Sequence, residues 1–536
     1  MSTSPPSTEE FHTLKPSRGF DRFRRCFNGR LLYSCFLIAL SQVNFGMDLG
    51  AFGGTQAMPA FKKQFGKYNP VKDVYVLESS YLSLLNSLTY IGFGFGVLSG
   101  SFISNRFGRR KALFTMCFWA IAGAAIMITS RVKQQMMAGR IIAYVYIGME
   151  LALVPVFQSE LVPAEIRGFA VGTYASGLLT GQLIQNIIAR ATSGLEGNKS
   201  WQIPIGLLFV MPVLMLAGVK FIPESPRWLL VKNRREEALI SLRLVREGPY
   251  TEAQIQAEFR SLQSTIDLTV EKGRFIEIFQ KINLKRTLIV IGTNIVVQAT
   301  GQNLWTQYGT LYIQSLGVIN PFTMTTVNTA IAIAMVLLGQ YLTDLTGRVP
   351  LLMISSTLQI GIFAAMGALG TVHDPSRAVR TGATVMLTLF GACLQFSWSP
   401  LFHAVVAEVP TQRLRDQTYA VGCLFNVLTQ WTISFSLPYL LFEPRNLGPQ
   451  VGFIFCFTSV VSLIFAYFCI PECFGKTLEE VDQLFLERVP IRKFRNARPT
   501  ILDDMRAAAA AEKLDVVETS VVIHEENATL PKGLTN

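Results

Sequence analysis

Charged residues stand inside long apolar stretches of this sequence at three places. Asp48 falls in the first stretch, and Arg140 and Glu150 fall in the fourth. An ionised side chain within a membrane is costly unless it is paired, so such residues mark a proton or substrate pathway, or a structural ion pair. Burial favours the neutral form of a carboxyl group, and a nearby guanidinium favours the charged form. Asp48 with Arg140 is therefore suited to take up and release a proton, and a static ion pair is the alternative.

Glu150 and His403 are two further polar groups inside expected membrane helices. Glu150 has three interpretations: a second protonation site, a hydrogen-bond acceptor for substrate, or a protonated acid bonded to a neighbouring helix. His403 is the only one of the four histidines that lies in an expected span. It could bind substrate, take part in proton coupling, or serve as a structural hydrogen-bond partner.

Amide and aromatic side chains gather in one short segment, with Gln298, Gln302, Asn303 and Tyr308 within it. Sugars are bound by amides, which both donate and accept hydrogen bonds, together with an aromatic face. The segment therefore predicts a binding site for a sugar or a similar hydroxylated solute. A single amide in a membrane helix also often serves only as a contact between helices.

The elements that carry these residues are long uncharged stretches. Only 16% of the residues are charged, against roughly 25% in an average soluble domain. Because about 20 apolar residues in a helix cross the hydrocarbon layer, and barrel strands are about half as long, these stretches predict membrane helices. The sequence predicts an all-α membrane protein with twelve transmembrane helices, at 31–54, 79–104, 112–130, 138–158, 170–190, 202–221, 286–315, 321–344, 350–371, 381–408, 417–441 and 450–470.

The positive charge lies beside these stretches. The formal net charge is +12, but the basic residues flank the spans, as the positive-inside rule requires of a multi-pass membrane protein with a cytosolic N-terminus. Twelve spans place both termini in the cytosol, and we expect the cell membrane. No basic patch interleaved with aromatic residues indicates a nucleic-acid partner. No catalytic, cofactor or metal-ligand motif is found, so neither an enzyme nor a bound metal is expected.

The spans divide into two halves that look like copies. We expect a cytosolic tail over 1–30, a six-helix bundle over 31–222, a cytosolic linker over 223–285, a second bundle over 286–471 and a cytosolic tail over 472–536. Helix-like segments such as Arg234–Arg246 lie in the linker. Glu160, Arg167, Gln182, Pro223 and Glu224 recur 248 residues later as Glu408, Arg415, Gln430, Pro471 and Glu472. This repeat predicts two pseudo-symmetric bundles with a central site, as in secondary transporters.

Several motifs occur in a fixed order along the chain: FGMDLGAFGG at 45–54, NRFGRRK at 105–111, PVFQSELVPAEIRG at 155–168, PESPRWL at 223–229, DLTGR at 344–348 and PECFGKTLEE at 471–480. In order and spacing they resemble the sugar porter family of the major facilitator superfamily over about 31–485. The first loop, 55–61, resembles fungal members.

The resemblance implies roles for particular residues. Asp48 would take the proton and Arg140 would tune its affinity for it. Charged residues at the cytosolic helix ends would form salt bridges that hold the inner gate shut in the outward-facing state: Arg109, Glu160, Arg167, Arg348, Glu408 and Arg415. The matching sugar contacts are Gln182, Gln298, Asn303, Tyr308 and Asn426.

Two departures from the family pattern widen the range of possible substrates. Ala175 stands where the family has a sugar-binding glutamine, and His403 stands where it has a tryptophan that stacks on the sugar. A disaccharide, a polyol, a sugar acid or another hydroxylated metabolite therefore becomes credible.

We expect proton-coupled symport of a sugar or sugar-like solute by alternating access. A facilitative uniporter and an efflux carrier for a secondary metabolite are the alternatives. A nutrient sensor is disfavoured because only about fifty residues follow Phe485, whereas the fungal sensors carry long tails. The expected partners are the small-molecule substrate, protons and the lipid bilayer, with a monomeric protein. Asn198 opens a glycosylation sequon in a loop expected outside the cell.

Overall fold

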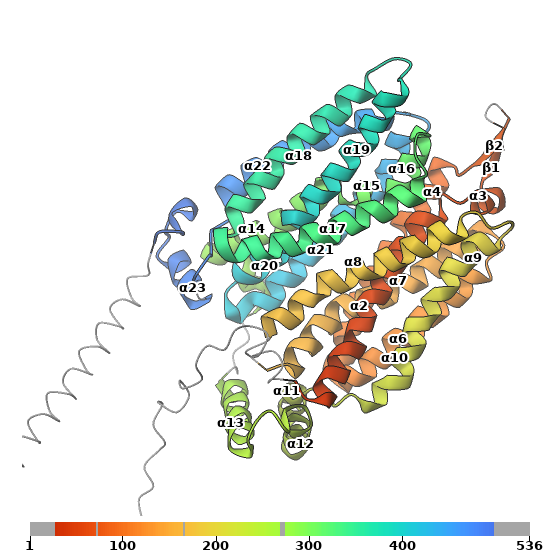
Figure 1. Ribbon diagram of the computed structural model, residues 1–536. Coiled ribbons are helices and arrows are strands. Elements are labelled where there is room, and N and C mark those ends of the chain that lie inside the picture. The colour runs from red at the N-terminus through yellow and green to blue at the C-terminus, as the bar shows by residue number, and fades with distance from the viewer. Residues whose placement is uncertain (1–26, 71–72, 164–166, 269–273, 477, 498–536) are drawn as a thin grey trace, which may run out of the picture.

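The computed structural model describes residues 27–70, 73–163, 167–268, 274–476 and 478–497, and most of them are helical. Most of the expected tail 1–30, and the expected tail 472–536 beyond residue 497, lie outside the described residues. The helices form two bundles that lie side by side (Figure 1). The predicted fold, twelve membrane helices in two six-helix bundles, is confirmed.

The first bundle contains the first six spans. In chain order they are α2 (Gly29–Thr55), α4 with α5 (Ser79–Ser87 and Thr89–Phe107), α6 (Arg109–Ile128), α7 (Lys133–Leu161), α8 (Arg167–Thr192), and a sixth span made of α9, η3, α10 and η4 (Lys199–Gly206, Leu207–Phe209, Val210–Gly218 and Val219–Phe221).

The second bundle contains the other six. They are the broken span α14, α15 and α16 (Lys281–Ala299, Gln302–Thr306 and Gly309–Leu316), α17 (Pro321–Thr346), α18 (Arg348–Gly370), α19 with the π-helical turn η6 and α20 (Arg377–Cys393, Leu394–Trp398 and Ser399–Glu408), α21 (Arg415–Leu441) and α22 (Val451–Cys469). Ten helical segments of the described chain are long and apolar enough to cross a membrane; the other two spans are α8 and the broken one.

The seventh span departs from the prediction of one helix over 286–315. It begins earlier, at Lys281, and is interrupted after Ala299. Gly301 adopts a left-handed conformation, with φ of 99°, which only glycine adopts readily. Short helices then carry Gln302 and Gly309. The interruption lies within the segment of amide residues singled out above.

Several smaller elements were not predicted. The loop after α2 forms α3 (Pro59–Phe65) and an antiparallel hairpin of β1 (Lys67–Asn69) and β2 (Val74–Val76), in which Lys67 pairs with Val76. The chain after the last span forms α23 (Leu478–Leu486). We call the end of the molecule with α3 and the hairpin the hairpin side.

The linker helices lie at the opposite end, which we call the linker side (Figure 1). They are α11 (Pro226–Val231), α12 (Arg235–Arg246) and α13 (Glu252–Leu268), followed by the short η5 (Phe275–Phe279). The expected helix Arg234–Arg246 is α12. Arg246 donates to the Leu161 carbonyl at 2.7 Å, so α12 is attached to the first bundle. Thr287 donates to the Ile278 carbonyl at 2.8 Å, so η5 is attached to the second.

Hydrogen bonds join the two bundles in their hairpin-side halves. They connect Lys62 with Gln314 (2.6 Å), Gln314 with the Ala57 carbonyl (3.0 Å), Ser83 with the Phe435 carbonyl (2.6 Å), Tyr90 with Gln307 (3.1 Å), Asn186 with Thr329 (2.8 Å) and Arg190 with Thr323 (2.6 Å). The hairpin side is therefore closed in this conformation.

Candidate functional site

The first bundle contains a buried acid–base pair. Oδ2 of Asp48 on α2 lies 3.4 Å from Nη1 of Arg140 on α7, and both side chains are at most 2% exposed. The guanidinium carbon of Arg140 lies 3.5 Å from the centre of the Phe52 ring, and Nε has no hydrogen-bond partner among the described residues. Charge-assisted hydrogen bonds are usually about 2.7–2.9 Å long. The two predicted residues are thus brought together in a loose contact.

A small cavity lies beside this pair. Its volume is about 10 Å³, and Asn44, Asp48 and Tyr146 supply its polar walls. The side-chain oxygens of Asn44 and Tyr146 have no hydrogen-bond partner within the described part of the chain. A space of this size with polar walls holds about one water molecule. Asp48 therefore has room for one water molecule beside it.

Glu150 lies apart from the pair, ten residues after Arg140 on α7, a rise of about 15 Å. Its side chain is fully buried. The Tyr174 hydroxyl of α8 donates to Oε2 at 2.8 Å, and the Ser41 hydroxyl of α2 lies 3.5 Å from Oε1. No cation pairs with it among the ion pairs of the described residues. A buried carboxylate without a cation is costly, so this site favours a carboxyl group that holds a proton.

Amide side chains form a cluster between the broken span and α21. Gln298 donates to Oδ1 of Asn426 at 3.4 Å, Asn303 donates to the Gln430 carbonyl at 3.1 Å, and Tyr308 donates to the Ser434 carbonyl at 2.8 Å. Four of the predicted sugar contacts are thus brought together. The oxygen Oε1 of both Gln298 and Gln302 is buried and has no partner in the described part, so the cluster retains free acceptors.

Two residues of this cluster were not predicted from the sequence. Asn294 accepts from Asn426 at 3.1 Å, and Gln430 donates to Asn426 at 2.6 Å. Two signals were available in the sequence. Asn294 precedes Gln298 by four residues and therefore shares its helix face, and Gln430 is the repeat partner of Gln182.

Gln182 and His403 lie outside the cluster. Gln182 is on α8 in the opposite bundle and is 4% exposed. His403 is on α20, and its side chain is exposed. Its ring packs on Phe402, with ring centres 3.8 Å apart. Ala175 on α8 is partly buried.

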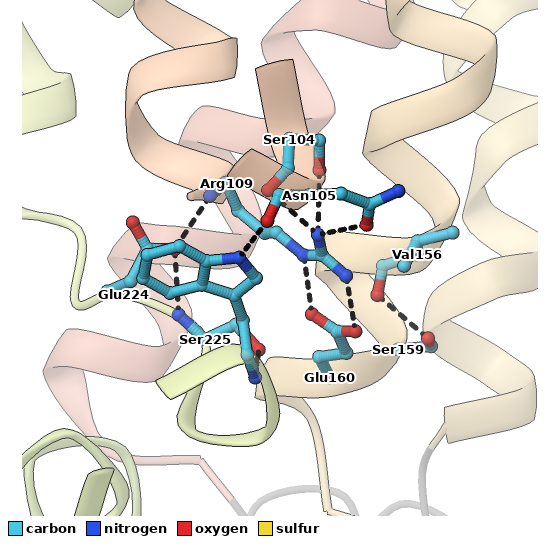
Figure 2. A network of polar contacts seen from close by, with 9 residues as sticks. Ser104, Asn105, Arg109, Val156, Ser159, Glu160, Glu224 and Ser225 are labelled. Carbon is cyan, nitrogen blue, oxygen red and sulfur yellow. Dashed lines mark hydrogen bonds and ion pairs between the residues drawn. The ribbon is translucent and has the colours of Figure 1, made fainter. Parts of the chain in front are cut away.

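The predicted gating residues form one ion pair in each bundle, on the linker side. Figure 2 shows the first: Nε and Nη2 of Arg109 bind the two oxygens of Glu160 at 3.0 and 2.9 Å, and Nη1 reaches Ser104. In the second bundle Nη2 of Arg348 lies 2.7 Å from Glu408. Each pair joins helices of its own bundle. Nε and Nη2 of Arg415 have no partner among the described residues, and the Arg167 side chain lies outside them.

A further carboxylate stands beside each pair and was not predicted to take part. Glu224 accepts from the backbone N–H of Arg109 at 2.8 Å (Figure 2), and Glu472 accepts from that of Arg348 at 3.1 Å. Each carboxylate therefore caps the N-terminus of the helix that follows, α6 or α18. Burial raises the pKa of Glu224, although the N–H donors and Arg110 act in the opposite direction.

The turn before each capped helix depends on glycine. Gly108 has φ of 104° and ψ of 167°, and Gly347 has φ of 95° and ψ of 179°, a region that is essentially restricted to glycine. A Cβ atom would lie 2.5 Å from Glu224 at the first position and 2.8 Å from Glu472 at the second. The repeat seen in the sequence thus corresponds to two copies of one structure.

Asn198 is exposed on the hairpin side, in the residue before α9. The Trp201 indole donates to its Oδ1 at 3.4 Å, and Ser200 is buried. The sequon asparagine therefore lies on the opposite side of the molecule from the linker helices.

Two six-helix bundles, with polar groups between helices in each, define a transporter of the major facilitator type. The chain matches the family described as Sugar (and other) transporter over residues 34–485. It therefore belongs to this family, the sugar porter branch of that superfamily, whose members carry their solute by alternating access. It is a transporter and not an enzyme.

Relatives of similar length match most of the chain. The major facilitator-type transporter ecdD of Aspergillus rugulosus is 29% identical over 494 residues, 89% of this chain and 90% of the relative. The high-affinity glucose transporter ght2 of Schizosaccharomyces pombe is 29% identical over 474 residues, covering 87% and 88%. The high-affinity gluconate transporter ght3 of the same yeast is 28% identical over 478 residues, covering 86% and 84%.

Solved structures agree with the fold. The xylose transporter XylE from E. coli, in a partially occluded inward open conformation, has a TM-score of 0.70 and 20% identity, and the match covers 84% of this chain and 100% of that one.

Proposed function

We propose that this protein is a proton-coupled symporter of a sugar or a sugar-like hydroxylated solute. The observation that carries the proposal is the buried contact between Asp48 and Arg140, 3.4 Å apart. A facilitative carrier has no need of a titratable group at this place, and an unpaired charge there would be costly. A proton on Asp48 removes its attraction for Arg140, so α2 and α7 become free to shift relative to one another.

We propose the amide cluster as the solute site. Gln298, Gln302, Asn303, Tyr308 and Asn426 supply donors, acceptors without a partner among the described residues, and an aromatic group on the second bundle. Gln182 would contribute from the first bundle. Relatives named for glucose, fructose and gluconate support a substrate with several hydroxyl groups. Ala175 and His403 in place of a glutamine and a tryptophan favour a solute other than glucose bound in the usual pose.

We propose Glu150 as a second proton site. It is buried and has hydroxyl partners instead of a cation. It shares α7 with Arg140, so a movement of this helix changes the surroundings of both groups. A substrate hydroxyl is the other partner that this carboxyl group could bind.

The gating proposal concerns the linker-side charges. Arg109 with Glu160 and Arg348 with Glu408 stand on separate bundles, and we propose that these pairs, with Arg167 and Arg415, meet across the interface when the linker side closes. The free guanidinium nitrogens of Arg415 support this rearrangement. A network that forms in only one conformation biases the equilibrium between two states.

We propose that the protein is a monomer in the cell membrane. Its linker side would face the cytosol. Basic residues at that side, including Arg110, Lys111 and Lys220, agree with the positive-inside rule. Both termini would then be cytosolic, the chain would divide into the tails, bundles and linker given above, and Asn198 would carry a glycan outside the cell.

The test of proton coupling uses purified protein in liposomes, with labelled solute and an imposed pH gradient. Asp48→Asn keeps the size of the side chain and removes its titration, so gradient-driven accumulation should fall to the level of a leak while solute exchange continues. Asp374→Asn, at an exposed carboxylate on the hairpin side, is the matched control and should accumulate normally. Accumulation by Asp48→Asn equal to that of the unaltered protein would show that Asp48 is not the coupling group, and uptake by the unaltered protein that ignores the gradient would identify a uniporter.

A further inference from the structure

A groove of about 400 Å³ lies on the linker side of the first bundle. Its walls come from three separate parts of the chain: the start of α6, the end of the sixth span, and the linker helices. Arg110 and Lys111 contribute from the first, Lys220 from the second and Arg234 from the third. Basic side chains far apart in sequence therefore converge on one hollow.

The positive charge of the groove is only partly neutralised. Glu224 points into the turn before α6 and accepts backbone N–H groups there (Figure 2). Glu237 is engaged by Arg234. Lys111 and Lys220 are exposed and take part in none of the ion pairs found among the described residues, and the Arg110 guanidinium is held over the groove by the Lys220 carbonyl at 2.9 Å. Three cations therefore remain for an anion.

The surroundings of the groove are apolar on the face that meets lipid. Phe107 and Phe114 line the groove and are 49% and 54% exposed, and Phe221, next to Lys220 in the sequence, is 69% exposed. Exposed residues continue from there along the neighbouring helices, with Phe118 on α6 and Leu214 on α10. An anion with hydrocarbon chains fits this arrangement, because its chains can lie on the α6–α10 face while its phosphate occupies the groove. A free anion would use only the basic part.

We propose that this groove binds the phosphate headgroup of an anionic phospholipid. Arg110 supplies a planar donor for phosphate oxygens, and Lys111 and Lys220 supply point charges. Basic pockets between helices at the cytosolic face are suited to such headgroups. The general attraction of basic residues to an anionic leaflet is sequence-independent and unsaturable, whereas this groove has room for a single headgroup and predicts saturable binding.

The test measures lipid binding to the full-length protein in detergent by native mass spectrometry. Phosphatidylserine is the probe and phosphatidylcholine is the neutral comparison. One phosphatidylserine should bind in a saturable manner. The double variant Lys111→Gln/Lys220→Gln should weaken this binding by about fivefold for each lysine, about twenty-fivefold together. Lys111→Arg/Lys220→Arg keeps both charges and should bind as the unaltered protein does.

The matched control is Lys63→Gln/Lys199→Gln, which removes two exposed lysines on the hairpin side and should leave binding unchanged. An equal loss in this control, or no loss in the groove variant, would overturn the proposal. Soluble phosphoserine supplies the headgroup without its chains. If it displaces the lipid at comparable concentration, the occupant is a free phosphate compound and the assignment to lipid is wrong. Thermal unfolding of each variant verifies that it is folded. If the glutamine variant does not fold, the arginine variant keeps the comparison valid.

Discussion

Asp48 and Glu150 are both carboxyl groups buried in the first bundle, but their neighbours differ. Asp48 faces the guanidinium of Arg140, so the gain or loss of its proton changes a contact between α2 and α7. Glu150 faces only the hydroxyls of Ser41 and Tyr174. In the proposed mechanism a proton on Glu150 would add to the charge that is moved without breaking an ion pair between helices.

This difference predicts the effect of Glu150→Gln. The amide keeps an oxygen for the Tyr174 hydroxyl and removes the titration, so the fold and solute exchange should persist while one fewer proton accompanies each solute. At a gradient of about one pH unit each coupled proton contributes about tenfold to accumulation, so steady-state accumulation should fall about tenfold. Tyr174→Phe is the control, since it leaves the carboxyl group in place. Unchanged accumulation by Glu150→Gln would assign this residue to structure alone.

His403→Trp tests the assignment of the solute site. The side chain is exposed and lies on α20, so an indole at this position could offer a flat apolar face to a sugar ring. Preference should shift toward simple hexoses, measured as the ratio of uptake rates for glucose and for the native solute. Trp431→His, on the exposed surface of α21, controls for the exchange itself. A ratio that does not change would remove His403 from the site.

At this scale the sequence was informative where a residue type is rare in its surroundings. A charge in a membrane helix has few roles, so Asp48, Arg140 and Glu150 could be singled out. Asn294 and Gln430 were missed, although spacing and the repeat pointed to them, because an amide in a helix joins helices as often as it binds a solute. Only the rotation of α14 and α21 determines which amides meet.

The two capped turns are the elements in which the repeat is best preserved. Gly108→Ala should lower the free energy of unfolding by about 1–3 kcal/mol, because alanine is strained at this φ and ψ and its Cβ atom collides with Glu224. Thermal unfolding in detergent measures the effect. Gly94→Ala, in the middle of α5 with no atom within 4 Å of an added Cβ, is the control. A loss of stability no larger than that of Gly94→Ala would contradict the account of the turn.

The helices themselves were predictable within a few residues, since long apolar stretches leave a helix as the only way to satisfy the backbone in lipid. The interruption after Ala299 was not, because a glycine is common in membrane helices and usually leaves them intact. Neither were α3 and the hairpin, which lie in a polar loop where no periodic pattern indicates an element. Contacts with the other bundle, such as Lys62 of α3 with Gln314 of α16, are not visible in the sequence.

At the scale of the whole molecule, the hairpin side is closed in this conformation. Lys62 contributes to the closure through its hydrogen bond with Gln314. Burial lowers the pKa of Lys62 to about 8, whereas the same amine in water titrates near 10.5. Below about pH 8 the amine is charged in both conformations. Between these two pH values, a conformation with the hairpin side open, in which Lys62 is in water, binds more protons than the closed one. A rise in pH through this window therefore shifts the equilibrium constant toward the closed conformation, by up to about tenfold per pH unit.

Spin labels at Leu195 and Ile319, which are exposed on the hairpin side of the two bundles, can measure this equilibrium by pulsed electron resonance. The short-distance population should grow as the pH rises from about 8 to about 10. Lys62→Met should abolish the dependence on pH, and Lys63→Met, at an exposed neighbour, should preserve it. A dependence that survives Lys62→Met must come from another group.

Most of the linker between the bundles is attached to the first bundle. α11, α12 and α13 are fastened to the first bundle, as by Arg246 at the Leu161 carbonyl, and η5 is fastened to the second, as by Glu277 with Arg413 at 3.2 Å. α13 ends at Leu268 and η5 begins at Phe275, so the change of attachment comes after α13, well after Pro223. For protein engineering this is the junction at which to cut the gene into two co-expressed halves, to insert a reporter domain, or to exchange bundles between relatives, because each half would keep its own supports.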